Sequence, residues 1–318
     1  MQKKITVCLA AFHGEKYIKE QLASLLNQHR RPDEILIGDD SPDDKTGEAV
    51  AEFITDHSCG NLIRYRKNPL RMGITGNFGA LIADASGDYI FLCDQDDVWL
   101  PSKIEQIASM LDSPVYDCVF CNSLVVDDAL ASLGYSTADI VHLTPAIADR
   151  INQGAGTLDI LRTPPAYGHN MAFKAEMRKY ILPMPLLQSY DLYITLLAAG
   201  LGRIGCINKN LTFFRRHGCN QSAQETGMFA RINRLCNRKK AREEIAVSEL
   251  HIRAAADRLA ASMAEHLPEI YGSKKYYNRR LNLQAMPYLF RPISILSSLP
   301  EYYRYGSGLK SILRDFIF

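Results

Sequence analysis

Residues 5–50 read ITVCLAAFHGEKYIKEQLASLLNQHRRPDEILIGDDSPDDKTGEAV, and the fold class can be predicted from this stretch. It begins with an apolar run of strand length at Ile5–Phe12, and a second such run follows at Glu34–Gly38. Between the two runs, apolar residues recur at the spacing of one helix face: Ile18, Leu22, Leu25 and Leu26. A strand, a helix and a second strand in this order predict a βαβ unit with two parallel strands.

The alternation of strands and helices continues beyond this unit. We expect strands at Leu62–Arg66 and Asp88–Cys93, and a helix at Gly76–Ser86 that stops at Gly87. Three later strands are also expected: Tyr116–Ser123, Asn170–Lys174 and Arg203–Ile207. The sequence therefore predicts an α/β fold with a Rossmann-like, mainly parallel sheet flanked by helices.

Composition and charge limit the classes of protein. The chain has 318 residues, of which 47% are hydrophobic and 23% charged, as in ordinary globular proteins. Its net charge of +2 argues against a nucleic-acid partner. Residues 1–228 carry 21 Lys and Arg against 27 Asp and Glu, whereas residues 229–318 carry 16 against 8. We therefore expect a first domain at residues 1–225 and a basic helical extension at 226–318 that meets a different partner.

The cysteines and the N-terminus bear on location. Eight cysteines are scattered without paired metal spacing, and the one CxxC, Cys118–Cys121, lies in an apolar run, which favours buried thiols over a zinc or redox site. Free thiols are typical of a reducing compartment. The start MQKKITVCLAAFHG lacks the pattern of a signal peptide, and no run of 18 apolar residues occurs. We expect a cytoplasmic protein.

Acidic residues follow the predicted strands. YIFLCDQDDVWLP, residues 89–101, places three of them directly after an apolar run: Asp94, Asp96 and Asp97. Asp39 and Asp40 follow the second strand and Glu15 the first, so these carboxylates should converge at one edge of the sheet. They repel one another unless a cation lies among them, and their oxygen ligands suit Mg²⁺ or Mn²⁺. The alternative is a solvated turn that caps the next helix.

These motifs resemble family 2 glycosyltransferases of the GT-A fold. Residues 5–50 are similar to the first half of that family's domain, with its apolar strand, its helix ending in LxQ and its DEIIIVDDGSxDxT motif. NPLRMGITGNFGALIADASGDYIFLCDQDDVW, residues 68–99, is similar to the segment that ends in D-x-D-D. The motif DQDDVW further resembles the corresponding segment of bacterial enzymes that build polysaccharides, including rhamnosyltransferase-like members.

The resemblance implies roles at the nucleotide end of a site. Asp40 would recognise a uracil or thymine base, and Ala10, Phe12 and Glu15 would line the nucleoside pocket. The chain departs from the family where YN is replaced by Phe12-His13 and where DDGS is replaced by DDSP. These departures affect contacts to the nucleobase and leave the acids in place.

The resemblance also implies a metal site. Asp94 and Asp96 match the D-x-D motif that holds Mn²⁺ or Mg²⁺ against the diphosphate of a sugar nucleotide. Asp97 would orient the donor sugar or a water on the metal.

Direct displacement at the sugar needs a base for the acceptor hydroxyl. Asp191, in LQSYDLYITLLAAG, opens an apolar helix at the place where the family carries its general base. The alternative is that Asp191 only caps that helix and faces its dipole. Asp159 and Glu176 are rival candidates for the base.

A basic segment, FFRRHGCNQS at residues 213–222, resembles the family's YRxHxxN segment, whose basic residues approach the diphosphate. Arg216 and His217 are the candidates, with Arg215 next to them, and a solvated basic loop is the alternative. His169, in GHNMAF, would lie near the acceptor, and we assign it no catalytic role.

The C-terminal sequence YLFRPISILSSLPEYYRYGSGLKSILRDFIF, residues 288–318, mixes apolar, aromatic and basic residues. Leu309, Ile312, Leu313 and Phe316 form an apolar stripe beside Lys310 and Arg314. This pattern is typical of a helix lying on an anionic membrane surface, here the inner face of the cell membrane. Packing on the first domain or on another copy of the chain, as a homo-oligomer, is the alternative.

Together these features predict an inverting, metal-dependent glycosyltransferase. The donor would be a UDP- or dTDP-linked sugar. The acceptor would be a saccharide, which the family resemblance implies is lipid-linked, and the reaction would serve bacterial cell-surface polysaccharide synthesis. Two alternatives stay open. A sugar-nucleotide pyrophosphorylase would carry a Gly-rich loop with Arg or Lys right after the first strand, whereas AAFHGEKY has one Gly and no such loop. A catalytically inactive binding subunit would not need to retain these acids.

Overall fold

The first apolar run forms strand β1 (Ile5–Ala11), all of whose residues are buried. In the computed structural model, which describes residues 2–217, 238–262 and 266–317, β1 lies at the centre of a parallel group. Strand β2 (Glu34–Asp39) flanks it on one side and β4 (Tyr89–Asp94) on the other. Strand β3 (Ile63–Lys67) continues the sheet beyond β2. The predicted βαβ unit and its parallel strands are confirmed.

The sheet becomes mixed beyond β4. Strand β8 (Met171–Lys174) pairs antiparallel with both β4 and β6 (Cys118–Val126), and β6 pairs parallel with β9 (Ile204–Arg215). Strand β5 (Val98–Trp99) closes that edge against β9, and β7 (Ser132–Ser136) pairs with β6. The resulting order of β3-β2-β1-β4-β8-β6-β9-β5 brings the turn after β4 next to the end of β9.

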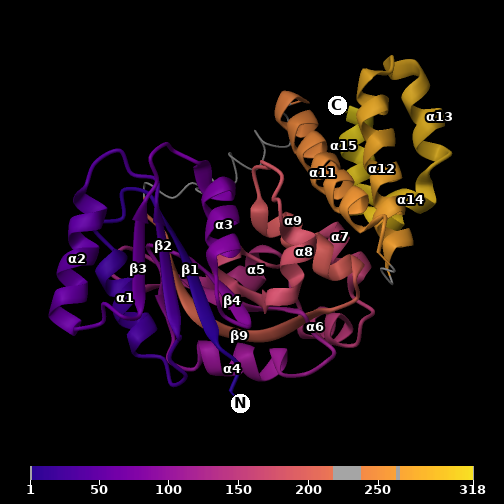
Figure 1. Ribbon diagram of the computed structural model, residues 1–318. Helices are drawn as coiled ribbons and strands as arrows, with labels where there is room; N and C mark the ends of the chain where they lie inside the picture. The colour runs from indigo at the N-terminus through magenta and orange to yellow at the C-terminus, as the bar shows by residue number, and fades with distance from the viewer. Residues whose placement is uncertain (1, 218–237, 263–265, 318) are drawn as a thin grey trace.

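Helices cover both faces of the sheet (Figure 1). On one face, α1 (Ile18–Leu26), α2 (Lys45–His57) and α4 (Lys103–Leu111) share a core with alternate residues of β1 such as Val7 and Leu9. On the other face, α3 (Gly73–Asp84) and α9 (Tyr190–Gly200) pack against Cys8 and Ala10. Successive side chains of β1 therefore pack alternately into the cores on the two faces of the sheet, which explains why the strand is apolar throughout. The predicted α/β class is confirmed.

Shorter helices fill the connections between β7 and α9. They are α5 (Thr137–Ile140), α6 (Pro145–Asn152), α7 (Thr157–Arg162) and α8 (Arg178–Ile181). Two 3₁₀ turns, η1 (Gly168–Asn170) and η2 (Ala175–Met177), flank β8. This is the loosely patterned region of the sequence, and η1 places its residues beside β4.

The C-terminal residues form a helical unit that packs on the sheet domain. Helix α11 (Arg238–Leu259) lies against α9 and buries Ile252, Ala255 and Leu259 there. The helices that follow are α12 (Leu267–Ala285), α13 (Arg291–Leu296), α14 (Leu299–Tyr305) and α15 (Leu309–Ile317), with the 3₁₀ turn η3 (Tyr288–Phe290) before α13. They enclose a small core of their own around Tyr276 and Tyr302. The predicted domain boundary at residues 225 and 226 lies outside the described residues.

Two further expectations concern thiols and membrane spans. Cys118 and Cys121 are buried in β6, and burial raises the pKa of both thiols, to about 12 and about 11. Among the described helices, none is both long enough and apolar enough to cross a bilayer.

Candidate active site

A cavity of about 770 Å³ opens where β1 and β4 end and where α3 and α9 begin. Six of the residues predicted from the sequence line it: Ala10, Phe12, Asp40, Asp94, Asp96 and Asp191. The first five come together because the carboxyl ends of neighbouring parallel strands share one edge of the sheet, and Asp191 joins them from the start of α9. Within the described part of the chain, the predicted residues Glu15, Asp97, Arg216 and His217 lie outside the lining of this cavity.

Asp94 is the last residue of β4 and lies beside Ala10 of β1. A third of its side chain (33%) is exposed, on the cavity side. Desolvation of its carboxylate, followed by the charges of Asp96 and Asp191, raises the pKa of Asp94 to about 7. The repulsion that the sequence predicts between these acids is therefore present, and a cation among them would relieve it.

Asp96 lines the cavity from the same turn and is held by the predicted basic segment. His217 Nε2 lies 2.9 Å from Asp96 Oδ2, and Arg215 Nε donates to the Asp96 backbone oxygen at 3.0 Å. Arg216 donates its backbone N–H to Val126 O at 2.8 Å, at the end of β6. The basic segment after β9 therefore contacts the acidic turn through Arg215 and His217.

Asp97 is buried behind the cavity, with a side chain that is 0% exposed. Its Oδ1 accepts the Arg215 backbone N–H at 3.2 Å, whereas its Oδ2 has no hydrogen-bond partner among the described residues. Burial, followed by the charges of Asp96 and Asp94, raises the pKa of Asp97 well above its ordinary value. A buried carboxylate oxygen without a donor is unfavourable and marks a place where a cation or proton belongs.

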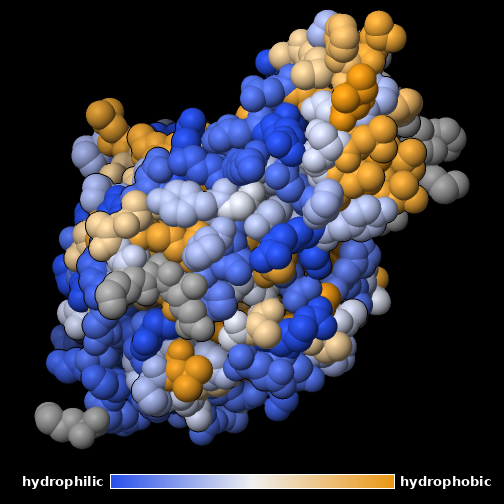
Figure 2. All heavy atoms as spheres, turned by 90° about the vertical axis from the view of Figure 1, so that its right-hand side faces the viewer, coloured by the Kyte–Doolittle hydropathy of each residue, from blue (hydrophilic) through white to orange (hydrophobic). Residues whose placement is uncertain are grey.

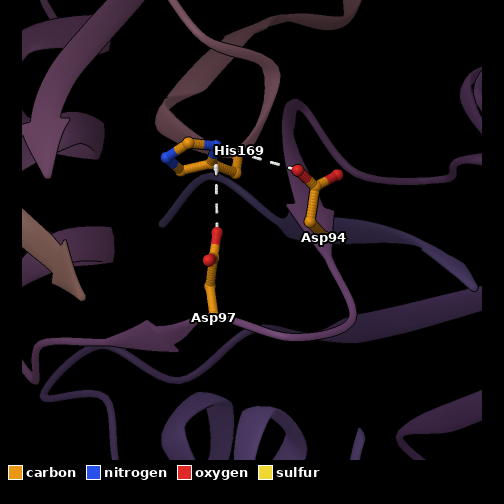
Figure 3. Close-up of side chains that lie close together, drawn as sticks. All are labelled: Asp94, Asp97 and His169. Atoms are coloured by element: carbon orange, nitrogen blue, oxygen red, sulfur yellow. Dashed lines mark ion pairs between the residues drawn. The ribbon is translucent and has the colours of Figure 1, made fainter. Parts of the chain in front are cut away.

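His169 lies at the acidic turn, although from the sequence we expected it near the acceptor and assigned it no catalytic role. Its Nδ1 lies 3.7 Å from Asp94 Oδ2 and 3.8 Å from Asp97 Oδ2, and Figure 3 shows both carboxylates reaching toward the ring. Ser123 Oγ lies 3.0 Å from Nε2, and Phe214 stacks on the ring. Burial, followed by the charge of Lys103, keeps the pKa of His169 well below its ordinary value, so the ring is neutral. One atom each of Asp94, Asp97 and His169 lie within 4.8 Å of one another, close enough to hold a metal ion.

Lys103 is a second residue that the sequence did not reveal. It is the first residue of α4, yet it is 1% exposed. Its Nζ donates to His169 O at 2.6 Å and to Thr212 Oγ1 at 2.7 Å, and it lies 3.7 Å from the centroid of the Trp99 ring. Lysine is rarely buried and is unfavourable at a helix N-terminus. A lysine at the predicted start of a helix is the sequence feature that could have revealed it, because residues that are locally unfavourable often belong to functional sites.

Asp191 faces the cavity from the first turn of α9. Its Oδ1 accepts the Leu192 N–H at 2.8 Å and its Oδ2 accepts the Gly168 N–H at 3.3 Å. The helix-terminal hydrogen bond of the capping alternative is thus present, but Ser189 occupies the N-cap position. Burial raises the pKa of Asp191 above its ordinary value despite these bonds. The rival Asp159 instead pairs with Arg150, and neither it nor Glu176 lines the cavity.

The other end of the cavity is built around Phe12 and Asp40. The side-chain amide of Gln95 exchanges two hydrogen bonds of 2.8 Å with the Phe12 backbone, so the turn after β4 fixes the turn after β1. The Arg71 guanidinium lies 4.1 Å from the Phe12 ring centroid. Asp40 Oδ1 accepts from Asn68 Nδ2 at 2.8 Å and from the Met72 N–H at 3.1 Å. Among the described residues, no hydrogen bond to Asp40 Oδ2 occurs, and Asp40 lines the cavity.

Two of the acids expected at the rim have structural partners. Asp39 is buried and accepts from Tyr65 Oη at 2.7 Å and from the Ser41 N–H at 2.9 Å. Glu15 lies against Thr46 Oγ1 at 3.4 Å and is not part of the cavity lining. Asp39 therefore orders the turn after β2, which positions Asp40.

The cavity joins Phe12 and Asp40 at one end to a cluster of carboxylates at the edge of a parallel sheet, and this is the place where α/β proteins hold their ligands. The family model described as Glycosyl transferase family 2 matches residues 6–180, which is more than half of the chain. The chain belongs to this family, and the resemblance stated from its motifs is confirmed.

Curated relatives carry glycosyltransferase names. The chain is 28% identical over 128 residues to UDP-Glc:alpha-D-GlcNAc-diphosphoundecaprenol beta-1,3-glucosyltransferase WfgD of Escherichia coli, which covers 38% of this chain and 49% of that one. It is 34% identical over 119 residues to the dTDP-rhamnosyl transferase RfbG of Shigella flexneri, with coverages of 36% and 39%. The chain thus spans less than half the length of these two relatives.

Solved structures confirm the GT-A fold. Staphylococcus aureus TarS 1-349 in complex with UDP-GlcNAc superimposes with a TM-score of 0.59 at 16% identity, covering 95% of this chain and 81% of that one. The mannosyltransferase PcManGT from Pyrobaculum calidifontis, in complex with GDP-Man and Mn²⁺, gives a TM-score of 0.54 at 15% identity, with coverages of 94% and 87%.

Proposed function

We propose that the chain transfers a sugar from a nucleoside-diphosphate sugar to a saccharide acceptor, with inversion at the anomeric carbon. The observation that carries this proposal is one cavity lined at one end by Phe12 and Asp40 and at the other by Asp94, Asp96 and Asp191. Its volume of about 770 Å³ suits a sugar nucleotide together with part of an acceptor. Membership of the glycosyl transferase family supports the same reaction class.

At the nucleoside end, Asp40 recognises the base. Its Oδ1 is occupied by Asn68 and the Met72 N–H, which hold the carboxylate in place, and its Oδ2 accepts the N–H of a uracil or thymine. A UDP- or dTDP-linked sugar is therefore the donor. The printed names of the two relatives, one a UDP-Glc and the other a dTDP-rhamnosyl transferase, support this choice.

The acidic turn suits a divalent cation, Mn²⁺ or Mg²⁺. The unpartnered Oδ2 of Asp97 and the raised pKa of Asp94 both indicate a site that lacks positive charge. Asp94 and Asp96 would hold the ion because their carboxylates line the cavity, whereas Asp97 is buried behind it and faces His169. When bound, the ion offsets the charge that develops on the leaving diphosphate. The Mn²⁺ in the mannosyltransferase complex supports this assignment.

Asp191 is the general base for the acceptor. The acceptor oxygen forms a bond to the anomeric carbon while the bond from that carbon to the diphosphate oxygen breaks. The proton of the acceptor hydroxyl passes to the Asp191 carboxylate, and the electron pair of the broken bond leaves with the diphosphate. Attack from the side opposite to the leaving group inverts the anomeric configuration. The raised pKa of Asp191 makes its carboxylate a better proton acceptor than an exposed aspartate.

For the acceptor, we propose a lipid-linked saccharide in the synthesis of a bacterial cell-surface polysaccharide. The relative from Escherichia coli is named for a diphosphoundecaprenol acceptor, and both relatives come from bacteria. Free buried thiols such as Cys93 and Cys118 suit a reducing compartment, which supports a cytoplasmic site for the reaction.

The test is a panel of UDP- and dTDP-sugars, each assayed for binding, hydrolysis and transfer with Mn²⁺, with Mg²⁺ and with EDTA. We expect one donor to bind, and its turnover to stop when EDTA removes the metal. Binding and turnover that ignore the metal would overturn the proposal. Formation of a sugar nucleotide from a sugar phosphate and a nucleoside triphosphate would instead identify a pyrophosphorylase, and donor binding without any turnover would identify an inactive binding subunit.

A further inference from the structure

The C-terminal helical unit turns large apolar side chains toward solvent. Seven of them are more than half exposed and come from η3, α13 and α15: Leu289, Phe290, Ile293, Leu296, Leu309, Leu313 and Phe316. We call this set the apolar face. Figure 2 shows apolar side chains gathered over the C-terminal helices, in the upper part of the molecule. Monomeric proteins rarely leave so many large apolar side chains together in water unless the surface binds something.

The apolar face is not a core that failed to form. The same helices already bury a separate set of side chains, among them Ile295, Tyr302 and Tyr305, in the core around Tyr276. Helix α15 is fixed in rotation because Asp315, on its inner side, forms a buried ion pair with Arg280 of α12 at 2.6 Å. The stripe of Leu309, Leu313 and Phe316 is thereby held outward, whereas a globular protein normally turns such a stripe to its core.

The helical unit that carries the apolar face has a positive net charge. Residues 266–317 carry eight Lys and Arg against three Asp and Glu. Lys310 is exposed on α15 beside the stripe, and the Lys275 side chain on α12 is 70% exposed and lies 3.9 Å from Glu301. A second copy of the chain, docking the same surface on itself, would bring these like charges together. An anionic bilayer, by contrast, attracts the lysines and takes up the apolar side chains.

We propose that the apolar face binds the surface of an anionic lipid bilayer, with α13 and α15 lying in the interface. This contact goes beyond the transfer reaction and does not depend on it. If the acceptor is lipid-linked, as proposed above, the contact keeps the protein at the membrane where that acceptor resides.

The experiment is sedimentation of the full chain with lipid vesicles, without sugar nucleotide. Wild-type protein should bind vesicles that contain phosphatidylglycerol and bind vesicles of phosphatidylcholine alone far more weakly, and added salt should weaken the binding. The double variant Ile293→Asp, Leu313→Asp should lower the affinity by about tenfold or more, because two charges enter the apolar layer. Lys275→Gln combined with Lys310→Gln should reduce binding to the anionic vesicles.

Val115→Asp is the matched control, because Val115 is 54% exposed and lies on the sheet domain, outside the apolar face. It should bind vesicles as the wild type does. Circular dichroism and thermal unfolding, both expected to be unchanged, show that the variants fold. The proposal is overturned if the wild type does not bind anionic vesicles, or if Val115→Asp reduces binding as much as the double variant. It is also overturned if light scattering shows a dimer that the double variant dissociates, since a second copy then covers the face. None of these readouts requires transfer, so they fail independently of the proposed reaction.

Discussion

Lys103 Nζ lies 2.6 Å from the backbone oxygen of His169, beneath the acidic turn that carries Asp94 and Asp97. The ammonium is fully buried, and burial lowers the pKa of Lys103. It joins the start of α4 to η1, and its charge acts to lower the pKa of both Asp94 and Asp97. We infer that Lys103 is a positioning residue, because it holds His169 and moderates the acids without lining the cavity.

Lys103→Met tests this role. The substitution keeps the apolar stem but removes the charge and the two hydrogen bonds to His169 and Thr212. Metal affinity should fall by about tenfold or more, as when other residues that support metal ligands are removed. Trp99 is the only tryptophan of the chain and contacts Lys103, so its fluorescence can follow a Mn²⁺ titration. Lys67→Met is the control, since Lys67 pairs with Asp44 at the surface. Equal metal affinity in the two variants would remove Lys103 from this role.

The parts of the site that the sequence predicted are those that follow strands. Asp40, Asp94 and Phe12 come directly after apolar runs, and parallel strands in neighbouring positions bring such residues together without any knowledge of packing. Asp191 was recognised through the helix that it opens, because an acid at the start of an apolar helix can be identified in the sequence alone. Local pattern and sheet direction were sufficient to place Asp40 and Asp94 at this edge, whereas Phe12 and Asp191 were assigned to the site through the family resemblance.

The remaining parts depend on contacts between elements far apart in the sequence. His169 reaches Asp94 only because β8 inserts antiparallel between β4 and β6, a crossover that the loose pattern of this region does not predict. The same holds for His217 and Asp96, which meet because β5 pairs with β9. Asp97 follows Asp96 in sequence, but a turn of the chain places its side chain in the interior. Adjacent acids therefore differ in role for reasons that spacing alone does not show.

Asp96 and Asp97 can be separated by experiment. Asp96 lines the cavity, so Asp96→Asn should weaken Mn²⁺ binding by about tenfold or more in a calorimetric titration. Asp97→Asn should have a smaller effect, because Asn is isosteric with the protonated acid that the raised pKa of Asp97 favours. If Asp97→Asn weakens the metal more than Asp96→Asn does, the ion is held by Asp94, Asp97 and His169, which lie within 4.8 Å of one another, and our assignment of Asp96 is wrong.

The helical unit depends on the ion pair between Arg280 and Asp315. Both side chains are buried, and Asp315 accepts two hydrogen bonds from the guanidinium and one from Tyr302 Oη at 2.6 Å. Asp315→Asn leaves the Arg280 charge buried without a counter-charge, so the free energy of unfolding should fall by about 3–5 kcal/mol. Urea unfolding followed by circular dichroism measures the change. The pair of Arg304 and Glu269, whose side chains are 55% and 24% exposed, is the control, and Glu269→Gln should cost less than about 1 kcal/mol. Equal effects of the two substitutions would contradict the prediction.

The pH dependence of transfer should report Asp191. A base must be ionised to accept the proton, so transfer falls as the pH is lowered through the pKa of Asp191, and burial places this fall at a higher pH than for an exposed aspartate. Asp191→Asn should reduce the transfer rate by about 10²–10⁴-fold and leave donor binding in place. It should also abolish the fall in rate at low pH, which is the acidic limb of the pH profile. Asp159→Asn should retain both rate and limb, because Asp159 pairs with Arg150 away from the cavity. Donor binding is measured at each pH with saturating metal. This control distinguishes a fall in rate caused by release of the metal from one caused by protonation of the base. An acidic limb that persists in Asp191→Asn at a normal rate would show that another group takes the proton.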